Sequence, residues 1–291
     1  MRRLVVNASA KVNLTLEVLG KRPDGYHEIA TVMQAVDLSD QVVLEDARSL
    51  MLETDAAGVP TGADNLVMRA AALLREAAGV DRGARIRLAK RIPVAAGLGG
   101  GSSDAAATLW GLNRLWGVRW GGERLSELAV RLGMDVPFFL GRGRALATGR
   151  GERIERLPGG GAYALVLVNP NIALPAREVY GRVTEAVFSD GSRVPAMLKA
   201  LERRNAAVVA ASLYNGLETV VEPAWPVVGR IKAALASAGA LGAVMSGSGP
   251  TVVVVARSLD HARQIRTRVA RASWSCWSVR TVSGPAVRLA G

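Results

Sequence analysis

The pattern of hydrophobic and polar positions divides the first half of the chain into strands followed by helices. Alternation of polar and apolar side chains predicts strands at residues 4–18, in a region that runs through Val36, at 41–44 and at 84–88. Apolar positions that share one face predict helices at 65–78, from 105 to 116 and at 122–132. A turn is expected at 21–25, where proline is followed by Asp-Gly.

The second half of the chain also contains both patterns, the alternation typical of strands and the spacing typical of helices. Strands are predicted at 163–168, 243–245 and 251–256, and helices at 194–211, 227–238 and 259–270, with a tail from Ser278 that can add a closing strand. The glycine run at 157–161 is the candidate domain boundary, which divides the chain into 1–157 and 158–291. Strands and helices do not alternate in regular βαβ units, so we expect an α+β protein of two domains.

Four glycines lie between a predicted strand and a predicted helix: Gly97, Gly99, Gly100 and Gly101. We expect the following Ser102, Ser103 and Asp104 at the N-cap or in the first helical turn. A bare backbone that leads into a helix N-terminus presents unpaired N–H groups and a positive dipole end, which favours an anion such as polyphosphate. The alternative is a tight strand-to-helix turn with a flexible surface loop.

Two common nucleotide motifs do not fit this loop. A Walker A loop requires lysine before the serine, and here Gly101 precedes Ser102 directly. A dinucleotide fingerprint requires glycine at position 102. The segment Pro93-Val94-Ala95-Ala96-Gly97-Leu98-Gly99-Gly100-Gly101-Ser102-Ser103-Asp104-Ala105 instead resembles the ATP-binding motif of the GHMP kinases.

Composition and charge exclude few classes of protein. The 291 residues are 49% hydrophobic and 21% charged, and no apolar run approaches the ~20 residues of a membrane helix. The single cysteine, Cys276, fits a reducing cytoplasm, where we expect the protein. The net charge of +12 comes mostly from arginines spread along the chain, which favours polyanionic substrates without indicating DNA or RNA.

Two residues are candidates for phosphoryl-transfer chemistry. Asp135 follows a predicted helix, and Pro137 is expected to keep the residue before it out of helical geometry. The carboxylate can serve as a base, although such an aspartate is more often a cap or turn residue. Lys11 lies in an apolar strand and can stabilise developing charge, or it can be an ordinary solvent-facing strand residue. With only His27, His261 and one cysteine, a transition-metal site is not expected.

The resemblance extends over nearly the whole chain. Six motifs occur in one order: Ala10-Lys11-Val12-Asn13-Leu14, Pro23-Asp24-Gly25-Tyr26-His27, Asp64-Asn65-Leu66, the glycine loop, Asp135-Val136-Pro137-Phe138-Phe139 and Met245-Ser246-Gly247-Ser248-Gly249-Pro250. Together they are similar to the branch of the GHMP kinases that phosphorylates a diphosphocytidyl methylerythritol in the non-mevalonate route to isoprenoids. The resemblance implies an N-terminal domain like one found in ribosomal proteins and a C-terminal ferredoxin-like α/β sandwich.

This resemblance also implies roles for individual residues. Asp135 is the expected general base and Lys11 its charged neighbour. Asn13, Tyr26, His27 and Tyr180 are expected to bind the acceptor, the two tyrosines by stacking on cytosine and His27 by hydrogen bonding to it. The residues expected to bind ATP are Asn65, Lys90, Pro93, Gly97, Leu98, Gly99, Gly100, Gly101, Ser102 and Ser103. We expect Mg²⁺ to be carried by the nucleotide, without a carboxylate cage of its own.

Two positions depart from the family pattern, and two other functions remain open. Ala176 stands where many relatives have threonine, and Asp104 where some have asparagine, a carboxylate whose role the sequence leaves open. One alternative is another GHMP kinase that acts on homoserine, a sugar or a mevalonate. The other is a basic nucleic-acid-binding protein without kinase activity. We expect a small-molecule substrate, no nucleic-acid partner and no membrane association, while the oligomeric state is left undecided.

Overall fold

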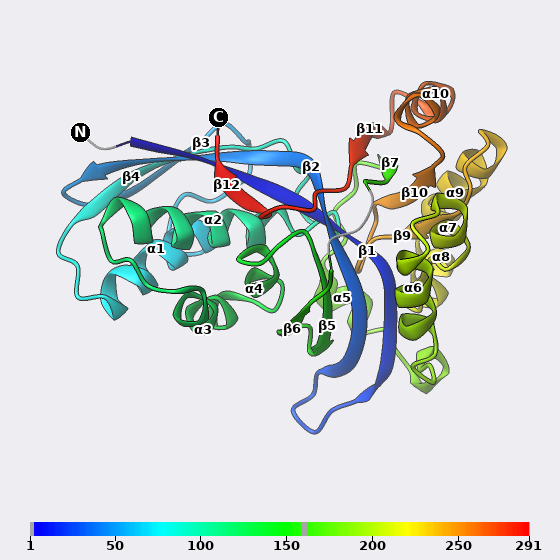
Figure 1. The fold of residues 1–291 in the computed structure, drawn as a ribbon, viewed down its shortest axis with the longest axis horizontal. Helices are drawn as coiled ribbons and strands as arrows, with labels where there is room; N and C mark the ends of the chain where they lie inside the picture. The colour runs from blue at the N-terminus through cyan, green and yellow to red at the C-terminus, as the bar shows by residue number, and fades with distance from the viewer. Residues whose placement is uncertain (1–2, 159–161, 291) are drawn as a thin grey trace.

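The computed structural model describes residues 3–158 and 162–290, which form two β-sheets with helices packed on them (Figure 1). The first sheet has eight strands, with β12-β1-β2-β4-β3 in order and three further strands attached: β5 to β2, β6 to β5, and β8 to β1. The second sheet has four antiparallel strands in the order β11-β7-β10-β9. The expected α+β class is therefore confirmed.

The hairpin of β1 (Arg3–Lys21) and β2 (His27–Ala47) extends from the first sheet toward the second half of the molecule (Figure 1). The strand expected at 4–18 is confirmed, but the two strands expected up to 36 and at 41–44 are one continuous strand. Asp40 interrupts the apolar pattern, yet it is fully buried and its carboxylate accepts bonds from Lys90 and Ile92. These tertiary partners keep the polar segment in the sheet.

The remaining strands and helices of the first half match the hydrophobic pattern closely. The helices expected at 65–78 and 122–132 and the strand at 84–88 are confirmed within one residue or two. The elements are β3 (Leu50–Thr54), α1 (Leu66–Ala77), β4 (Gly83–Ala89), α2 (Gly100–Leu115), α3 (Gly122–Leu132), α4 (Val136–Phe139), β5 (Arg144–Gly149) and β6 (Arg153–Arg156). β3, β5 and β6 are short strands that the pattern did not indicate.

The second half carries the smaller sheet, with most of its helices beside it (Figure 1). Its elements are β7 (Ala164–Asn169), α5 (Ala176–Tyr180), a 3-10 helix (Glu185–Val187), α6 (Arg193–Glu202), α7 (Ala206–Ala211), β8 (Tyr214–Asn215), α8 (Glu218–Ala224), α9 (Val227–Ser237), β9 (Ala243–Met245), β10 (Val252–Ala256), α10 (Leu259–Val269), β11 (Ser275–Arg280) and β12 (Val287–Leu289). None of the described helices is both long and apolar enough to cross a bilayer.

Two local expectations are wrong. The helix expected at 194–211 is two helices, because Arg204 has a positive φ and the Asn205 side chain accepts bonds from the N–H groups of Ala207 and Val208, which starts α7. Val136, expected outside a helix because Pro137 follows it, begins α4. A proline in the first turn lacks only an N–H that would be unpaired there, so the helix tolerates it.

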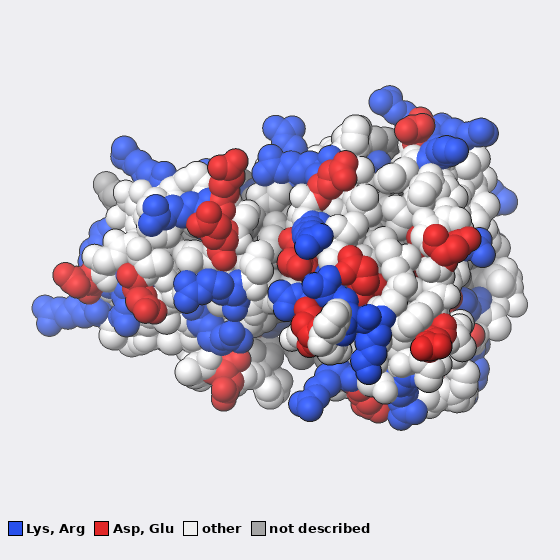
Figure 2. All heavy atoms as spheres, turned by 90° about the horizontal axis from the view of Figure 1, so that it is seen from below, with Lys and Arg blue, Asp and Glu red and all other residues white. Residues whose placement is uncertain are grey.

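Acidic and basic side chains are intermixed over the face that Figure 2 shows, rather than separated into one basic surface. Several of the basic residues pair with carboxylates at the surface, among them Arg85 with Glu53 and Arg87 with Glu45. The positive charge on this face is therefore distributed among acidic side chains rather than concentrated in one place.

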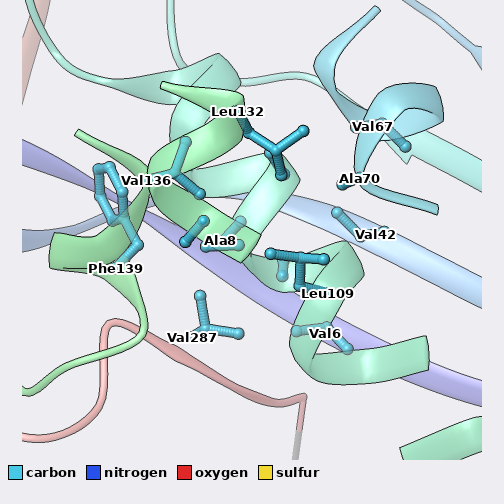
Figure 3. Packing of buried hydrophobic residues seen from close by; sticks show 14 of the residues in the cluster. Val6, Ala8, Val42, Val67, Ala70, Leu109, Leu132, Val136, Phe139 and Val287 are labelled. Carbon is cyan, nitrogen blue, oxygen red and sulfur yellow. The ribbon is translucent and has the colours of Figure 1, made fainter. Parts of the chain in front are cut away.

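The apolar core of the first half lies between the sheet and its helices (Figure 3). Val6 and Ala8 of β1 contribute to it together with Leu109 of α2 and Phe139 of α4, and all four are buried. Phe139 and Phe138 are in edge-to-face contact. This packing fixes α2 and α4, whose N-termini carry the glycine loop and Asp135.

The first strand, β1, and the last strand, β12, lie side by side in the first sheet. β12 pairs with β1, placing Val287 opposite Ala8 and Leu289 opposite Val6. The first sheet is therefore completed by residues that follow the whole second half, a feature that a linear division at 157 does not describe. Of the glycine run proposed as the boundary, residues 159–161 lie outside the described residues.

Candidate active site

The glycine loop adopts a backbone that side chains would prevent. Gly97 and Gly99 have φ values of +75° and +70°. A Cβ on Gly97 would collide with the carbonyl oxygen of Ser246, and one on Gly99 would lie 2.8 Å from the Phe139 ring. Glycine is therefore required at both positions by conformation and by close packing.

Helix α2 begins at Gly100, with Gly99 rather than a serine as its N-cap. The expected placement of Ser102 and Ser103 in the first turn is confirmed, since the Ser103 N–H bonds to the Gly99 carbonyl. The N–H groups of Gly100, Gly101 and Ser102 precede the first intrahelical bonds, so they are available to an anion at the positive end of the helix dipole.

Two cavities meet at this loop, and Gly97 and Gly99 line both. The smaller cavity, about 340 Å³, is lined by residues expected to bind ATP: Asn65, Lys90, Pro93, Gly97, Gly99, Gly100 and Gly101. The larger, about 920 Å³, is lined by the residues expected to carry catalysis and bind the acceptor: Lys11, Asn13, Tyr26, His27, Asp135 and Tyr180. The expected residues are thus separated by role into adjoining cavities.

Three residues of the expected ATP set line neither cavity: Leu98, Ser102 and Ser103. Leu98 is buried in the apolar core, and its carbonyl accepts the N–H of Lys11. Ser103 is fully buried, because it lies on the inner face of α2. The side chains of Leu98 and Ser103 are therefore directed into the protein and not into either cavity.

Lys11 and Asp135 lie together where the cavities meet. Lys11 Nζ is 3.4 Å from Asp135 Oδ2 and donates to Asn13 Oδ1 at 2.7 Å. The lysine side chain is 5% exposed, whereas that of Asp135 is 36% exposed and reaches the larger cavity. Lys11 is therefore not the solvent-facing strand residue of the simpler interpretation. A buried ammonium beside an accessible carboxylate suits proton transfer next to developing negative charge.

A side-chain hydroxyl adds a second connection between β1 and the glycine loop, beside the main-chain bond of Lys11 to Leu98. Ser246 Oγ donates to the Gly97 carbonyl at 2.9 Å and accepts the Asn13 N–H at 3.2 Å. Asn215 stabilises the same turn, because its Nδ2 donates to the carbonyls of Met245 and Gly247 at 2.7 Å each. The Ser246 turn thus holds together β1 at Asn13 and the glycine loop at Gly97, two segments that are far apart in the sequence.

The aromatic side chains expected at the base-binding end gather at one end of the larger cavity. His27 stacks on Tyr180, with ring centroids 5.6 Å apart and planes inclined by 28°. Burial lowers the pKa of His27, and the nearby Lys21 charge acts in the same direction. Tyr26 is 52% exposed, and the Arg150 guanidinium lies 5.0 Å from its ring centre. Burial, and then the charge of Asp135, raises the pKa of Tyr180, so its hydroxyl stays neutral.

At the nucleotide side, Lys90 holds two buried carboxylates together. Its ammonium donates to Asp104 Oδ2 at 2.7 Å and also to Asp40 Oδ2. Burial raises the pKa of Asp104 to about 7; Lys90 opposes this shift and Asp40 adds to it. Burial by itself lowers the pKa of Lys90, but the two carboxylates raise it overall. Asp104, whose role the sequence left open, therefore faces a basic group and ties α2 to Lys90.

Asn65 makes hydrogen bonds with both of its side-chain polar atoms. Its Oδ1 caps α1 by accepting the Val67 N–H at 2.8 Å, and its Nδ2 donates to the Pro60 carbonyl at 2.7 Å. The residue thus joins the start of α1 to the loop before it and forms one wall of the smaller cavity.

Three basic residues that sequence reasoning missed also line the larger cavity: Lys21, Arg150 and Arg177. Arg150 lies between Gly149 and Gly151, both of which have positive φ. That glycine–arginine–glycine pattern was the available signal, but only the fold brings it beside Tyr26. Ala176, the position where many relatives have threonine, lines the same cavity as Tyr180. No cluster of three or more metal-binding side chains occurs among residues 3–158 and 162–290.

Comparison with known proteins agrees with this geometry. Two family models match the chain: the GHMP kinases N terminal domain at residues 65–143, and the GHMP kinases C terminal model at residues 197–276. The chain is 49% identical to a 4-diphosphocytidyl-2-C-methyl-D-erythritol kinase of Pelotomaculum thermopropionicum, over 94% of this chain and 96% of that protein. It is 47% identical to one of Symbiobacterium thermophilum, over 95% of this chain and 99% of that protein.

A solved structure gives the same result in three dimensions. A crystal structure of a 4-(cytidine 5'-diphospho)-2C-methyl-D-erythritol kinase superposes with a TM-score of 0.84 at 38% identity, covering 97% of this chain and 100% of that one. Identity at this level over nearly the full length of both chains, together with both family models, leaves one assignment. The chain belongs to the 4-diphosphocytidyl-2-C-methyl-D-erythritol kinases of the GHMP kinase family.

Proposed function

We propose that the chain transfers the γ-phosphoryl group of ATP to the 2-hydroxyl of 4-diphosphocytidyl-2-C-methyl-D-erythritol. The names of its relatives supply the substrate, and the observation that carries the mechanism is the Lys11–Asp135 pair between two cavities that share Gly97 and Gly99. One cavity presents free helix N–H groups for a triphosphate, and the other presents aromatic side chains for a base.

In this mechanism Asp135 accepts the proton of the acceptor hydroxyl as its oxygen forms a bond to the γ-phosphorus. The bond between that phosphorus and the β–γ bridging oxygen breaks, and ADP leaves. Lys11, held by Asn13 Oδ1, stabilises the negative charge on the transferring group. Positioning and charge neutralisation supply most of the catalysis of phosphoryl transfer, so this short list of residues is sufficient.

The nucleotide enters as its Mg²⁺ complex, and the metal belongs to the substrate. The N–H groups at the start of α2 bind phosphate oxygens, and the apolar walls around Pro93 and Val94 enclose the adenine side. Val94 is 64% exposed at this wall, so its side chain is accessible to a bound nucleotide.

At the acceptor end, Tyr26 and Tyr180 stack on the cytosine and His27 hydrogen-bonds to its polar edge. The His27–Tyr180 pair is already stacked, and Tyr26 is an exposed ring at the same cavity. Lys21, Arg150 and Arg177 are suited to neutralise the substrate diphosphate, because cations that face an anionic group in a partly enclosed cavity are weakly screened. A cytoplasmic location is part of the proposal and fits the single, unpaired Cys276.

The test is a panel of acceptors with Mg·ATP: the diphosphocytidyl substrate, homoserine, mevalonate and galactose. ADP release is expected only with the first, and ³¹P NMR is expected to show one new phosphomonoester in addition to the diphosphate. CMP is expected to compete with the acceptor and not with ATP. Turnover with another acceptor but none with the diphosphocytidyl compound would contradict the proposal.

A further inference from the structure

A small cavity of about 70 Å³ lies apart from the two catalytic cavities, where the chain crosses between the sheets. Gln34 of β2 and Arg144 of β5 line it, together with Arg142 and with Thr281 and Ser283 of the segment that leads from β11 to β12. Thr281 also accepts the Tyr163 N–H, so both crossings between the halves of the molecule meet at this cavity.

Arg144 is a buried cation that lacks a carboxylate. It is 6% exposed, and across residues 3–158 and 162–290 no Asp or Glu lies within ion-pair distance of it. Its Nε donates to Gln34 Oε1 at 2.7 Å. The Gln34 amide is fixed, because Nε2 donates to the carbonyls of Ala35, Gly143 and Val282. One neutral acceptor does not compensate a buried guanidinium, which remains charged although burial lowers its pKa.

A second buried polar group lies nearby. The Tyr163 hydroxyl is buried without a hydrogen-bond partner among the described residues, and the Arg144 guanidinium is 5.8 Å from the Tyr163 ring centre. The cavity itself is lined by a second guanidinium and two hydroxyls and by no carboxylate. The Tyr163 side chain does not line this cavity. Arg144 does, and its buried charge, which has one neutral acceptor, calls for an acceptor with negative charge.

We propose that this cavity binds one small oxyanion, such as inorganic phosphate. Its size admits a single phosphate-sized group or a few waters and excludes a nucleotide. The planar fork of Arg144 suits two oxygens of one anion, and Arg142, Thr281 and Ser283 can contact the others. A bound anion joins β5 to the 281–283 segment, so it braces the crossing between the two sheets.

The experiment measures thermal unfolding of the full chain while phosphate replaces NaCl at constant ionic strength. Saturating ADP is present throughout, so that phosphate binding at the glycine loop does not contribute. Wild-type Tm is expected to rise with phosphate and to saturate, as ligand binding to the native state requires. Sulfate is expected to act in the same way, because it offers the same tetrahedral oxygens.

Three variants make the test specific. Arg144→Met is expected to show no phosphate response, since the guanidinium that binds the anion is removed. Arg144→Lys keeps the charge without the fork and is expected to need roughly tenfold more phosphate for the same shift. Arg153→Met, at an exposed position on the neighbouring β6, is expected to respond like the wild type.

Two results would overturn the proposal. One is a wild-type Tm that does not depend on phosphate, which would mean that water fills the cavity. The other is an equal phosphate response in wild type and Arg144→Met, which would place the anion elsewhere. If Arg144→Met does not fold, the Arg144→Lys titration decides, because an unchanged midpoint in that variant contradicts a site built on the guanidinium fork.

Discussion

At the scale of single residues, the site consists of side chains whose neighbours restrict them to one role. Lys11 is buried against Asn13 and Asp135, so it keeps its ammonium directed at the junction of the cavities. Ser246 connects Asn13 with Gly97 through one hydroxyl. Asp135 is the accessible member of the group, and we assign the proton transfer to it for that reason.

Asp135→Asn is expected to lower kcat by about 10²–10⁴-fold, the usual contribution of a general base. Folding is expected to be unchanged, because the side chain is partly exposed and the amide has nearly the same shape. The measurement is steady-state ADP release, with thermal unfolding in parallel. Asp260→Asn, 82% exposed on α10, is the control and should keep full activity. A kcat within twofold of the wild type would remove Asp135 from the mechanism.

Tyr26→Ala is expected to raise KM for the diphosphocytidyl substrate about 5- to 150-fold, since stacking of a base on an aromatic ring contributes roughly 1–3 kcal/mol. The kcat should change little, because Tyr26 lies away from the transferring group. Tyr26→Phe keeps the ring and is expected to behave like the wild type. Equal KM increases in both variants would show that the hydroxyl, and not the ring, binds the substrate.

At the scale of secondary-structure elements, the glycine loop contains positions where only glycine fits and one position where another residue would fit. Gly97 has positive φ and abuts the Ser246 carbonyl, whereas a Cβ on Gly101 would meet only Leu66 Cδ1 at 3.6 Å. The same substitution at Gly97 and at Gly101 therefore tests the loop geometry, with Gly101 as the control.

Gly97→Ala is expected to destabilise the protein and abolish activity, because the turn of Ser246 and the glycine loop must separate to admit the methyl group. Gly101→Ala is expected to keep the fold and to stabilise it by up to about 1 kcal/mol, since alanine is the better helix former. Urea unfolding monitored by circular dichroism distinguishes the two. A Gly97→Ala variant as stable as Gly101→Ala would contradict the described loop geometry.

The Asp40–Lys90–Asp104 group connects β2, the end of β4 and α2, and it makes stability depend on pH. Burial raises the pKa of Asp104 to about 7, well above the usual range of an aspartate, so between the two pKa values the folded state binds more protons than the unfolded state. The contribution of this group to stability is therefore largest in acid and decreases as pH rises from about 4 to about 7.

Asp104→Asn is expected to remove that pH-dependent contribution while keeping an oxygen that can accept from Lys90. The measurement compares the free energy of unfolding at pH 5 and pH 8 for both proteins. The wild type should lose more stability than the variant over this interval. The Asp260→Asn variant should match the wild type, and parallel pH profiles for wild type and Asp104→Asn would refute the assignment.

At the scale of the whole molecule, the chain closes on itself. β12 returns from the second half to pair with β1, and Ala286 and Val287 are buried in the core of the first half. The Ser246 turn also comes from the second half and hydrogen-bonds both to Asn13, the partner of Lys11, and to the glycine loop. The site therefore exists only when both halves are folded together.

Val287→Ala is expected to lower stability by roughly 1–3 kcal/mol, because it removes buried methyl groups and leaves a cavity. Leu289→Ala lies on the same strand but is 49% exposed, and it should change stability by less than about 0.5 kcal/mol. Chemical denaturation of both variants tests this. Equal effects would mean that β12 does not close the core of the first half in solution.

Local patterns in the sequence determined most of the elements and the types of chemistry. Apolar periodicity predicted α1, α3, β4 and α10, and the glycines before α2 predicted an anion-binding helix start, because both signals depend on neighbours within a few residues. The family motifs then indicated which side chains belong together.

Only the tertiary structure decided how those parts meet. It made β2 one strand by pairing Asp40 with Lys90, placed Arg150 beside Tyr26, and connected Gly97 to Asn13 through Ser246. It also buried Arg144 without a carboxylate and brought β12 back to β1. These contacts join residues separated by tens to hundreds of positions. No local periodicity predicts them, because they form only when the whole chain folds.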